Sequence, residues 1–221
     1  MNADKRQSTA LDTTYCYLIR HAATANNEHN PPVLQGRRLD SPLSAAGREQ
    51  AARAGRFLAA RPIAAVYASP MVRAVETARA VAEPHGLTVQ TVDELNEADL
   101  GVWEGLDWNQ IEQQYKDAYE AFMRDAGVNP YLGGETMNDV VDRAGPTIDR
   151  LLAENVGRTI AIVAHNVVNR TYLTRLLGLT ASHYRSVPQD NACVNLLRFR
   201  RGRTKAITVN GVFHLDGHGE W

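Results

Sequence analysis

Cysteine is scarce in this 221-residue sequence, which contains two such residues. Cys16 and Cys193 lie in separate apolar runs, where a cysteine usually behaves as a small buried hydrophobic residue. A disulfide framework and a Cys-x-x-Cys metal or redox motif are therefore both excluded. No run of eighteen apolar residues occurs, and the first dozen residues are polar and charged, unlike a signal peptide. We expect a cytoplasmic protein whose residues 1–13 form a flexible tail.

An excess of charge of either sign is also absent. The sequence has 24 Lys and Arg residues against 25 Asp and Glu residues, and the basic residues are scattered. A nucleic acid or an anionic membrane is therefore not expected as the main partner. There is no Walker loop, no glycine fingerprint for dinucleotides after a strand, and no Gly-x-Ser-x-Gly elbow. A small soluble ligand fits these properties best.

Short apolar runs rich in Val, Ile and Tyr alternate with longer stretches of helical periodicity. The runs predict strands at 15–20, 64–68, 87–92, 159–164, 194–199 and 206–215, with the last two joined in a hairpin at Arg201-Gly202. Helices are predicted at 44–61, 69–84, 108–124, 136–152 and 167–177, and Ser44 and Ser69 are the expected caps of the first two. The alternation predicts an α/β fold, a three-layer α/β/α sandwich with a mainly parallel sheet and an antiparallel C-terminal strand, in one domain spanning 14–221.

Three of the predicted strands are followed by side chains that can carry chemistry. Arg20-His21 follows the first strand, Ser69-Pro70 leads into Arg73 after the second, and His165-Asn166 follows the strand at 159–164. Because ligands bind at the C-terminal ends of the strands in such sheets, the three loops are expected to converge on one crevice. Two arginines and two histidines above a dry sheet suit phosphate recognition. The helix N-terminus at Ser69-Pro70 could also offer backbone N–H groups to an oxyanion.

Several motifs occur in a fixed order between about residues 15 and 200. They are Leu18-Ile19-Arg20-His21-Ala22-Ala23-Thr24 with Asn27; Leu34-Gln35-Gly36 with Asp40-Ser41-Pro42-Leu43-Ser44 and Gly47; Ser69-Pro70-Met71-Val72-Arg73-Ala74 with Thr77-Ala78; Leu95-Asn96-Glu97 with Gly101 and Trp103-Glu104-Gly105; Gly133-Gly134-Glu135-Thr136 with Arg143; and Val163-Ala164-His165. In this order they resemble the histidine phosphatase superfamily, also called the phosphoglycerate mutase-like family. Several motifs in the right order are far more specific than any one of them.

The resemblance implies a mechanism that passes through a phosphohistidine. His21 is expected to accept the phosphoryl group, and Glu97 is expected to act as the general acid. An attacking imidazole must be neutral, with its other nitrogen held by an acceptor such as a backbone carbonyl. The phosphoryl oxygens are expected to be held by Arg20, Arg73 and His165. No metal ion and no cofactor is implied.

The remaining site residues implied by the resemblance are expected to bind substrate, and they are Asn27, Gln35, Gly36 and Asn166. Some positions depart from the family pattern. The residue after His21 is usually glycine and here is Ala22, followed by Ala23 where an acidic residue is common. His165 is usually followed by glycine rather than Asn166. The rim of the substrate pocket is therefore expected to be unusual, while the proposed cationic groups are all present.

Three functions remain open at this stage. A phosphatase acting on a small phosphomonoester, of the sugar phosphate or phosphoglycerate type, is favoured by the short interval between Glu97 and His165. A cofactor-dependent phosphomutase is the nearer alternative, although mutases usually carry a Gly-Trp pair where Gln35-Gly36-Arg37 stands here. A catalytically inactive phosphate-binding domain is the third. The substrate and the oligomeric state stay open, a homodimer included.

Two further features have alternative interpretations. Trp103 and Trp108 could stack on a ring of the substrate, but packing against the edge of the sheet is the expected role. Glu135 follows two glycines and lies either near the mouth of the site or at a plain helix start.

Overall fold

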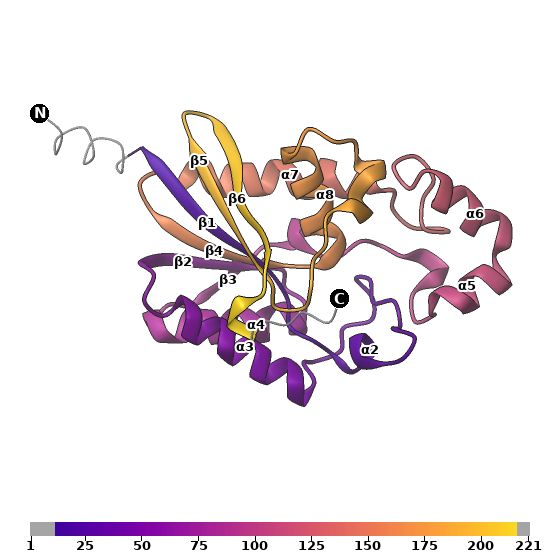
Figure 1. The fold of residues 1–221 in the computed structure, drawn as a ribbon, viewed down its shortest axis with the longest axis horizontal. Helices are drawn as coiled ribbons and strands as arrows, with labels where there is room; N and C mark the ends of the chain where they lie inside the picture. Colours follow the sequence, from indigo (N-terminus) through magenta and orange to yellow (C-terminus); the bar gives the residue numbers. More distant parts are fainter. Residues whose placement is uncertain (1–11, 216–221) are drawn as a thin grey trace, which may run out of the picture.

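Six strands form one mixed sheet in the computed structural model, which describes residues 12–215 (Figure 1). The strand order is β3-β2-β4-β1-β5-β6. The strands are β1 (Thr13–Arg20), β2 (Ile63–Ala68), β3 (Val89–Thr91), β4 (Thr159–Ala164), β5 (Val194–Arg200) and β6 (Arg203–Gly211). The pairs among β1, β2, β3 and β4 are parallel, whereas β5 pairs antiparallel with both β1 and β6. The predicted mainly parallel sheet with an antiparallel C-terminal addition is confirmed.

Helices cover the sheet on both faces (Figure 1). Ile160 and Ile162 of β4 belong to a cluster that includes residues of α7 (Met137–Glu154) and α8 (Asn166–Leu176). Ala161 and Val163 point the other way, into a cluster with residues of α3 (Ala45–Leu58) and α4 (Val72–Ala82). Since successive side chains of a strand alternate between faces, a strand that is apolar throughout must be buried on both. The predicted three-layer α/β/α arrangement is confirmed.

Some predicted element boundaries are wrong. β1 begins at Thr13, so the last residue of the expected tail is part of the sheet, and residues 1–11 lie outside the described range. The predicted strand at 206–215 begins earlier and ends at Gly211, and a short 3-10 helix, Phe213–Leu215, follows it. The predicted helix at 108–124 is two helices, α5 (Trp108–Gln114) and α6 (Lys116–Arg124), because the backbone of Tyr115 leaves the helical region. A further short α-helix, α2 (Ala25–Glu28), was not predicted.

The start of α4 also differs from the prediction. Ser44 caps α3 as expected by accepting from the Gly47 N–H, but α4 begins at Val72 rather than at Ser69-Pro70. The Val72 N–H donates to both carboxylate oxygens of Asp40, at 2.9 and 3.0 Å. A carboxylate from a distant loop thus caps this helix, which no local pattern reveals. The first N–H of the helix is therefore already engaged and is not offered to an oxyanion.

The register of the sheet brings three loops to one edge. β4 lies between β1 and β2, with Arg20 opposite Ala164 and Ala68 opposite Val163. The backbone N–H of His21 donates to Ala164 O at 2.9 Å, which continues the ladder by one residue. Parallel strands end at a common edge, so the residues that follow them are neighbours. The predicted convergence of the Arg20-His21 loop and the loop after β4 is confirmed.

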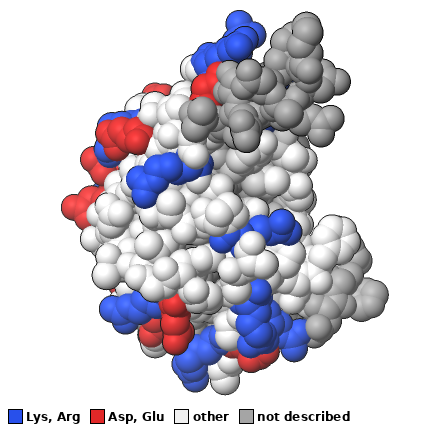
Figure 2. Space-filling model, turned by 90° about the vertical axis from the view of Figure 1, so that its left-hand side faces the viewer, with Lys and Arg blue, Asp and Glu red and all other residues white. Residues whose placement is uncertain are grey.

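Charged residues of both signs are interspersed with uncharged surface on the face drawn in Figure 2. The β5–β6 hairpin is a local exception to the scattered basic residues of the sequence, because five cationic side chains line one hollow there: Arg198, Arg200, Arg201, Arg203 and Lys205. Asp12 lies 3.7 Å from Arg200 Nε and 3.9 Å from Arg201 Nε. Within residues 12–215, no helix has both the length and the apolar character needed to cross a bilayer.

Candidate active site

Two buried histidines face each other where β1 and β4 end. The ring centroids of His21 and His165 lie 5.2 Å apart, and their side chains are 3% and 0% exposed. Arg20 is the last residue of β1, and Arg73 lies in the first turn of α4 with no exposed surface. Strand ends and a helix start therefore place these four residues, which makes their arrangement rigid.

The tautomer of His21 follows from one contact. Its Nδ1 lies 2.8 Å from the backbone carbonyl oxygen of Ala22, and because a carbonyl can only accept, Nδ1 carries the proton. The lone pair is then on Nε2. Burial, and next the charges of Arg73 and Arg20, lower the pKa of His21 well below its usual value of 6.5. His21 is therefore a neutral imidazole at neutral pH, with Nε2 available as a nucleophile.

Both arginines are fixed by backbone carbonyls. Arg20 Nη1 donates to Gln189 O at 2.6 Å, and Arg73 donates to Gly36 O at 2.9 Å and to Leu39 O at 3.1 Å. Burial is the main cause that lowers the pKa of Arg20 to about 10, so the guanidinium stays charged at neutral pH. These contacts use the terminal nitrogens and leave each Nε without a partner among the described residues.

His165 adds two more unpaired polar atoms. Both of its ring nitrogens are buried and have no hydrogen-bond partner within residues 12–215. Burial, and then Arg73, His21 and Arg20, lower the pKa of His165 well below 6.5. A buried polar atom without a partner costs about 1–3 kcal/mol, so several around one point indicate a site built for a hydrogen-bonding ligand. The positive charge of the two arginines makes an oxyanion the fitting ligand.

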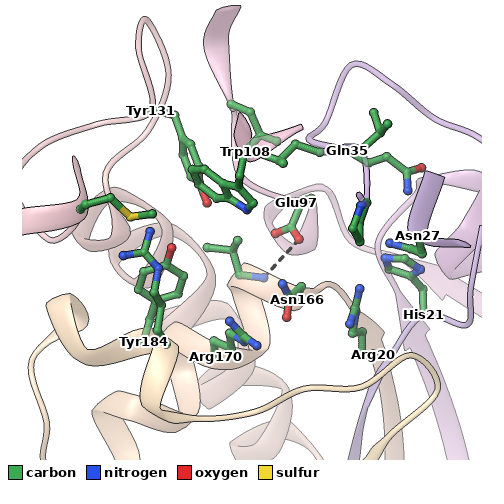
Figure 3. A pocket seen from close by; sticks show the side chains of 17 residues that line it. Arg20, His21, Asn27, Gln35, Glu97, Trp108, Tyr131, Asn166, Arg170 and Tyr184 are labelled. Atoms are coloured by element: carbon green, nitrogen blue, oxygen red, sulfur yellow. Dashed lines mark hydrogen bonds between the residues drawn. The ribbon is translucent and has the colours of Figure 1, made fainter. Parts of the chain in front are cut away.

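Glu97 lies on the opposite side of the pocket from Arg20 (Figure 3). Its carboxylate is 3% exposed and accepts from two backbone groups, Ala98 N–H at 3.0 Å and Val167 N–H at 3.1 Å. Burial raises the pKa of Glu97, while these two N–H groups and the charges of Arg73 and Arg20 oppose the rise. The result is a carboxyl group whose protonation responds to a change of charge in the pocket.

A partly exposed ion pair fixes the loop that carries Glu97. Arg143 of α7 donates to Glu94 O at 2.7 Å and Asn96 O at 3.0 Å, just before Glu97. It also pairs with Glu135 at 3.0 Å, whose other oxygen accepts from the Asp99 N–H, just after Glu97. Arg143 and Glu135 thus form a brace, a pair of side chains that holds this loop on both sides of Glu97. Glu135 does not line the pocket.

The pocket has a volume of about 330 Å³ and is lined by six of the nine residues expected at the site. Those six are Arg20, His21, Asn27, Gln35, Glu97 and Asn166. Arg73 and His165 are not among its lining residues, and neither is Gly36, which was expected to bind substrate. The Gly36 carbonyl holds Arg73, and an added Cβ would lie 2.7 Å from Ala98 O, so glycine is needed there for close packing.

The expected substrate-binding side chains are partly engaged within the protein. Asn27 Oδ1 accepts from the Thr24 backbone N–H at 3.1 Å, and Gln35 Nε2 donates to Thr24 Oγ1 at 2.5 Å. Gln35 Oε1 and Asn166 Oδ1 are buried and have no partner among residues 12–215. Asn166 and Gln35 therefore keep polar atoms for a ligand, whereas Asn27 mainly shapes the loop after His21.

The expected site residues did not include several side chains that line the pocket on the side away from His21. Trp108 was expected to pack at the sheet edge, but it lies beside Phe122 and also lines the pocket (Figure 3). Arg170, Tyr184 and Arg185 line it as well. Arg170 follows Asn166 by four residues, one helical turn, which is a usable signal in the sequence. Tyr184 and Arg185 lie in a 3-10 helix, Ala181–Ser186, that no pattern marked.

The fold and the site together define an α/β protein with two buried histidines and two arginines at the carboxyl ends of its parallel strands. Comparison with known families identifies it further. The model of the histidine phosphatase superfamily (branch 1) matches residues 16–211, and the chain belongs to this family. The family expected from the sequence motifs is confirmed.

Individual relatives cover nearly the whole chain. Phosphoserine phosphatase 1 of Hydrogenobacter thermophilus is 27% identical over 206 residues, which is 91% of this chain and 96% of that protein. Phosphoglycerate mutase-like protein 4 of Arabidopsis thaliana is 31% identical over 99% of this chain and 94% of its own length. The solved structure of a mycobacterial glucosyl-3-phosphoglycerate phosphatase has a TM-score of 0.80 at 29% identity and covers 90% of this chain and 100% of its own.

Proposed function

We propose that this protein hydrolyses phosphomonoesters of small metabolites, with His21 as the nucleophile. The observation that carries the proposal is the contact between His21 Nδ1 and Ala22 O, because it leaves the Nε2 lone pair free in a buried, cationic site. Nε2 attacks phosphorus and the bond to the ester oxygen breaks, which gives a phosphohistidine and an alcohol. Water then attacks phosphorus, the phosphorus–nitrogen bond breaks, and inorganic phosphate leaves.

Arg20, Arg73 and His165 hold the three phosphoryl oxygens during both transfers in this scheme. Their unpaired buried donors, two guanidinium Nε–H groups and one ring N–H of His165, support this role. Charge on these oxygens shifts as the phosphoryl group moves, and fixed donors stabilise the transition state without reorganising.

Glu97 provides the proton for the departing alkoxide. Burial already raises the pKa of Glu97, and the negative charge of a bound phosphate would raise it further. After proton transfer, the N–H groups of Ala98 and Val167 stabilise the carboxylate, which can then take a proton from the attacking water. A group with this role typically contributes about 10²- to 10⁴-fold to the rate.

The names of the relatives support a small phosphorylated metabolite as the substrate. Two of the relatives described above are named as phosphatases of phosphoserine and of glucosyl-3-phosphoglycerate. A third is named as phosphoglycerate mutase-like, so mutase activity is the alternative that the experiment must test. A pocket of about 330 Å³ is of the size that holds a small metabolite.

The test is hydrolysis of p-nitrophenyl phosphate and 3-phosphoglycerate in the presence of EDTA. We expect wild-type turnover, acid-labile phosphate on the protein after rapid quenching, and neither of these in His21→Ala. His85→Ala is the matched control, because His85 lies beyond the C-terminal end of α4, away from the pocket. Addition of 2,3-bisphosphoglycerate tests the alternative: a mutase forms 2-phosphoglycerate, whereas a phosphatase forms inorganic phosphate.

We further infer a reducing location, the cytoplasm. Cys16 and Cys193 are both unpaired and buried, and burial raises the pKa of the Cys193 thiol to about 12. Free thiols persist in reducing compartments, which supports this location. Cell fractionation with an antibody to the protein tests it, and recovery in an extracellular fraction would contradict it.

A further inference from the structure

Helix α8 carries two side chains that line the pocket, and it leads away from the end of the pocket at which Arg20 and His21 lie. Asn166 begins α8 immediately after His165, and Arg170 lies four residues further along. Residues four apart share a face of a helix and are separated by about 6 Å along its axis. Both side chains line the pocket, and Figure 3 shows Asn166 between Arg20 and Arg170. Arg170 is therefore one helical turn beyond the residues that would hold a phosphoryl group.

A second guanidinium group, that of Arg185, also lines the pocket, and the charges of Arg185 and Arg170 both act on the hydroxyl of Tyr184. Arg185 is held by aromatic rings, with its Cζ 5.1 Å from the ring centroid of Tyr184, 5.2 Å from Phe122 and 5.8 Å from Trp108. A guanidinium that stacks through its flat face still presents N–H groups at its edge, where carboxylates and phosphates bind. Arg185 thus lies in a fixed position at the wall that it shares with Arg170.

No carboxylate of the described pocket residues pairs with Arg170 or Arg185. Among the described residues that line the pocket, Glu97 is the one carboxylate, and both of its oxygens accept from backbone N–H groups. Neither Arg170 nor Arg185 has a carboxylate within 4 Å in the described part of the chain. Arg170 Nε is buried without a partner, and the charge of Arg170 lowers the pKa of Arg20, so Arg170 adds positive charge to a pocket that already holds Arg20. An anion bound at Arg170 would offset both costs.

We propose that Arg170 and Arg185 bind a second oxyanion, carried by the alcohol part of the substrate, and so select phosphomonoesters with a nearby carboxylate or second phosphate. The proposal rests on the proposed function, since it takes the Arg20–His21 end of the pocket as the place of the ester phosphate. Guanidinium groups bind either oxyanion through paired N–H groups, so the two sources share one chemistry and differ in shape.

Substrate pairs that differ in one group test this selection. 3-Phosphoglycerate and glycerol phosphate share a skeleton, and a carboxylate in the first replaces a hydroxymethyl group in the second. We expect kcat/KM to be at least about tenfold higher for 3-phosphoglycerate, mainly through a lower KM, because a hydrogen bond to a charged group has about this effect. Glycerol 1,3-bisphosphate supplies the second phosphate, and comparison of its kcat/KM with that of 3-phosphoglycerate distinguishes the two oxyanions.

Substitutions of the two arginines test whether they cause the preference for 3-phosphoglycerate over glycerol phosphate. Arg170→Gln should lower the ratio of kcat/KM for 3-phosphoglycerate to that for glycerol phosphate by at least about tenfold, and Arg185→Gln should lower it less. Arg175→Gln is the control, because Arg175 lies on the same helix but pairs with Asp149 at 2.7 Å and does not line the pocket. Turnover of glycerol phosphate by each variant shows that it is folded.

The two proposals can fail separately. Equal kcat/KM values for 3-phosphoglycerate and glycerol phosphate in the wild type, or an unchanged ratio in Arg170→Gln, would overturn the second oxyanion site while hydrolysis stands. Retained turnover in His21→Ala would overturn the proposed function instead. Calorimetric titration of 3-phosphoglycerate into His21→Ala measures binding without turnover, and Arg170→Gln in that background should weaken it at least about tenfold. Unchanged affinity there would also overturn the second site.

Discussion

Glu97 and Val167 are joined by a hydrogen bond of 3.1 Å between the carboxylate and the first-turn backbone N–H of α8. This bond ties the proposed acid to the helix that starts directly after His165 and also carries Asn166. The proposed acid and His165, a member of the proposed phosphate cage (Arg20, Arg73 and His165), are therefore held by one helix start, together with Asn166. Disturbing any one of them is expected to affect the geometry of the others.

Removal of the acid should be visible in a leaving-group comparison. Glu97→Gln keeps the size of the side chain but cannot donate a carboxyl proton, so kcat for 3-phosphoglycerate should fall about 10²- to 10⁴-fold. The loss of kcat/KM, which reports formation of the phosphohistidine and not its hydrolysis, should be much smaller for p-nitrophenyl phosphate than for 3-phosphoglycerate, because nitrophenolate leaves without a proton. Initial-rate kinetics on both substrates measure this difference. Glu154→Gln, at a surface pair with Arg150, is the control, and near-normal turnover of 3-phosphoglycerate by Glu97→Gln would remove Glu97 from the role.

The brace around Glu97 gives a second prediction. Arg143→Gln removes the donors to Glu94 O and Asn96 O, so the loop that carries Glu97 loses its anchor on α7. We expect kcat for 3-phosphoglycerate to fall about tenfold with little change in KM, since two charge-assisted bonds are lost away from the substrate. Arg143→Lys should restore part of kcat.

A purely structural role for Arg143 would give a different result. General destabilisation lowers kcat/KM for all substrates alike, whereas a displaced acid lowers kcat/KM for 3-phosphoglycerate more than that for p-nitrophenyl phosphate. Equal losses on the two substrates would therefore contradict the positioning role. Arg150→Gln on the same helix is the matched control, because Arg150 pairs with Glu154 at the surface.

The residues that were predictable from the sequence are those whose position depends on local structure. Arg20-His21 and His165 follow strands that were clear from their apolar runs, and the edge of a parallel sheet then brings them together. The neutral state of His21 was also foreseen, together with the carbonyl that fixes it. The period of the hydrophobic pattern and one general rule of α/β sheets predicted where these residues lie, whereas the neutral state of His21 was expected from the role that the family resemblance implied.

The residues that were not predictable depend on long-range contacts. Asp40 caps α4 from 32 positions away, and Glu135 meets Arg143 and Asp99 only after the chain has folded. Arg185 reaches the pocket because it stacks on rings from α5 and α6, and the packing of that segment has no signature in the sequence. Gly36 was assigned to the substrate because its motif is near the site, whereas its small size serves Arg73.

The two buried histidines predict how stability depends on pH. Burial lowers the pKa of His21 and of His165 in the folded state below the 6.5 of the unfolded chain. The unfolded chain then binds more protons below pH 6.5, so the free energy of unfolding decreases as pH falls through this value toward the folded pKa. Each histidine contributes up to about 1.4 kcal/mol per pH unit in this window.

The contribution of His165 can be isolated by comparing how much stability the wild type and a His165 variant each lose on acidification. Urea unfolding of the wild type and of His165→Gln at about pH 7.5 and about pH 5.5 gives the loss of stability on acidification for each protein. The raised pKa of Glu97 acts in the opposite direction, but it is common to both and cancels to first order. We expect a smaller loss in His165→Gln, and an equal loss would mean that His165 is not held neutral by burial.

A substitution at Gly36 tests whether the position of its carbonyl, which accepts from Arg73, depends on the close packing of this glycine. In Gly36→Ala the new methyl group would lie 2.7 Å from Ala98 O and 2.9 Å from Glu104 Oε2. The other oxygen of Glu104 accepts from the Gly36 and Arg38 N–H groups at 3.0 and 2.9 Å, so this carboxylate can move only by weakening those bonds. The free energy of unfolding should decrease by about 1–3 kcal/mol, as for other overpacked sites. Because Gly36 O holds Arg73, the KM for phosphomonoesters should also rise. Arg37→Ala is the control next in the chain, since its exposed side chain pairs with Asp99 outside the phosphate cage. A stable Gly36→Ala protein with a wild-type KM would show that the loop adjusts without moving Arg73.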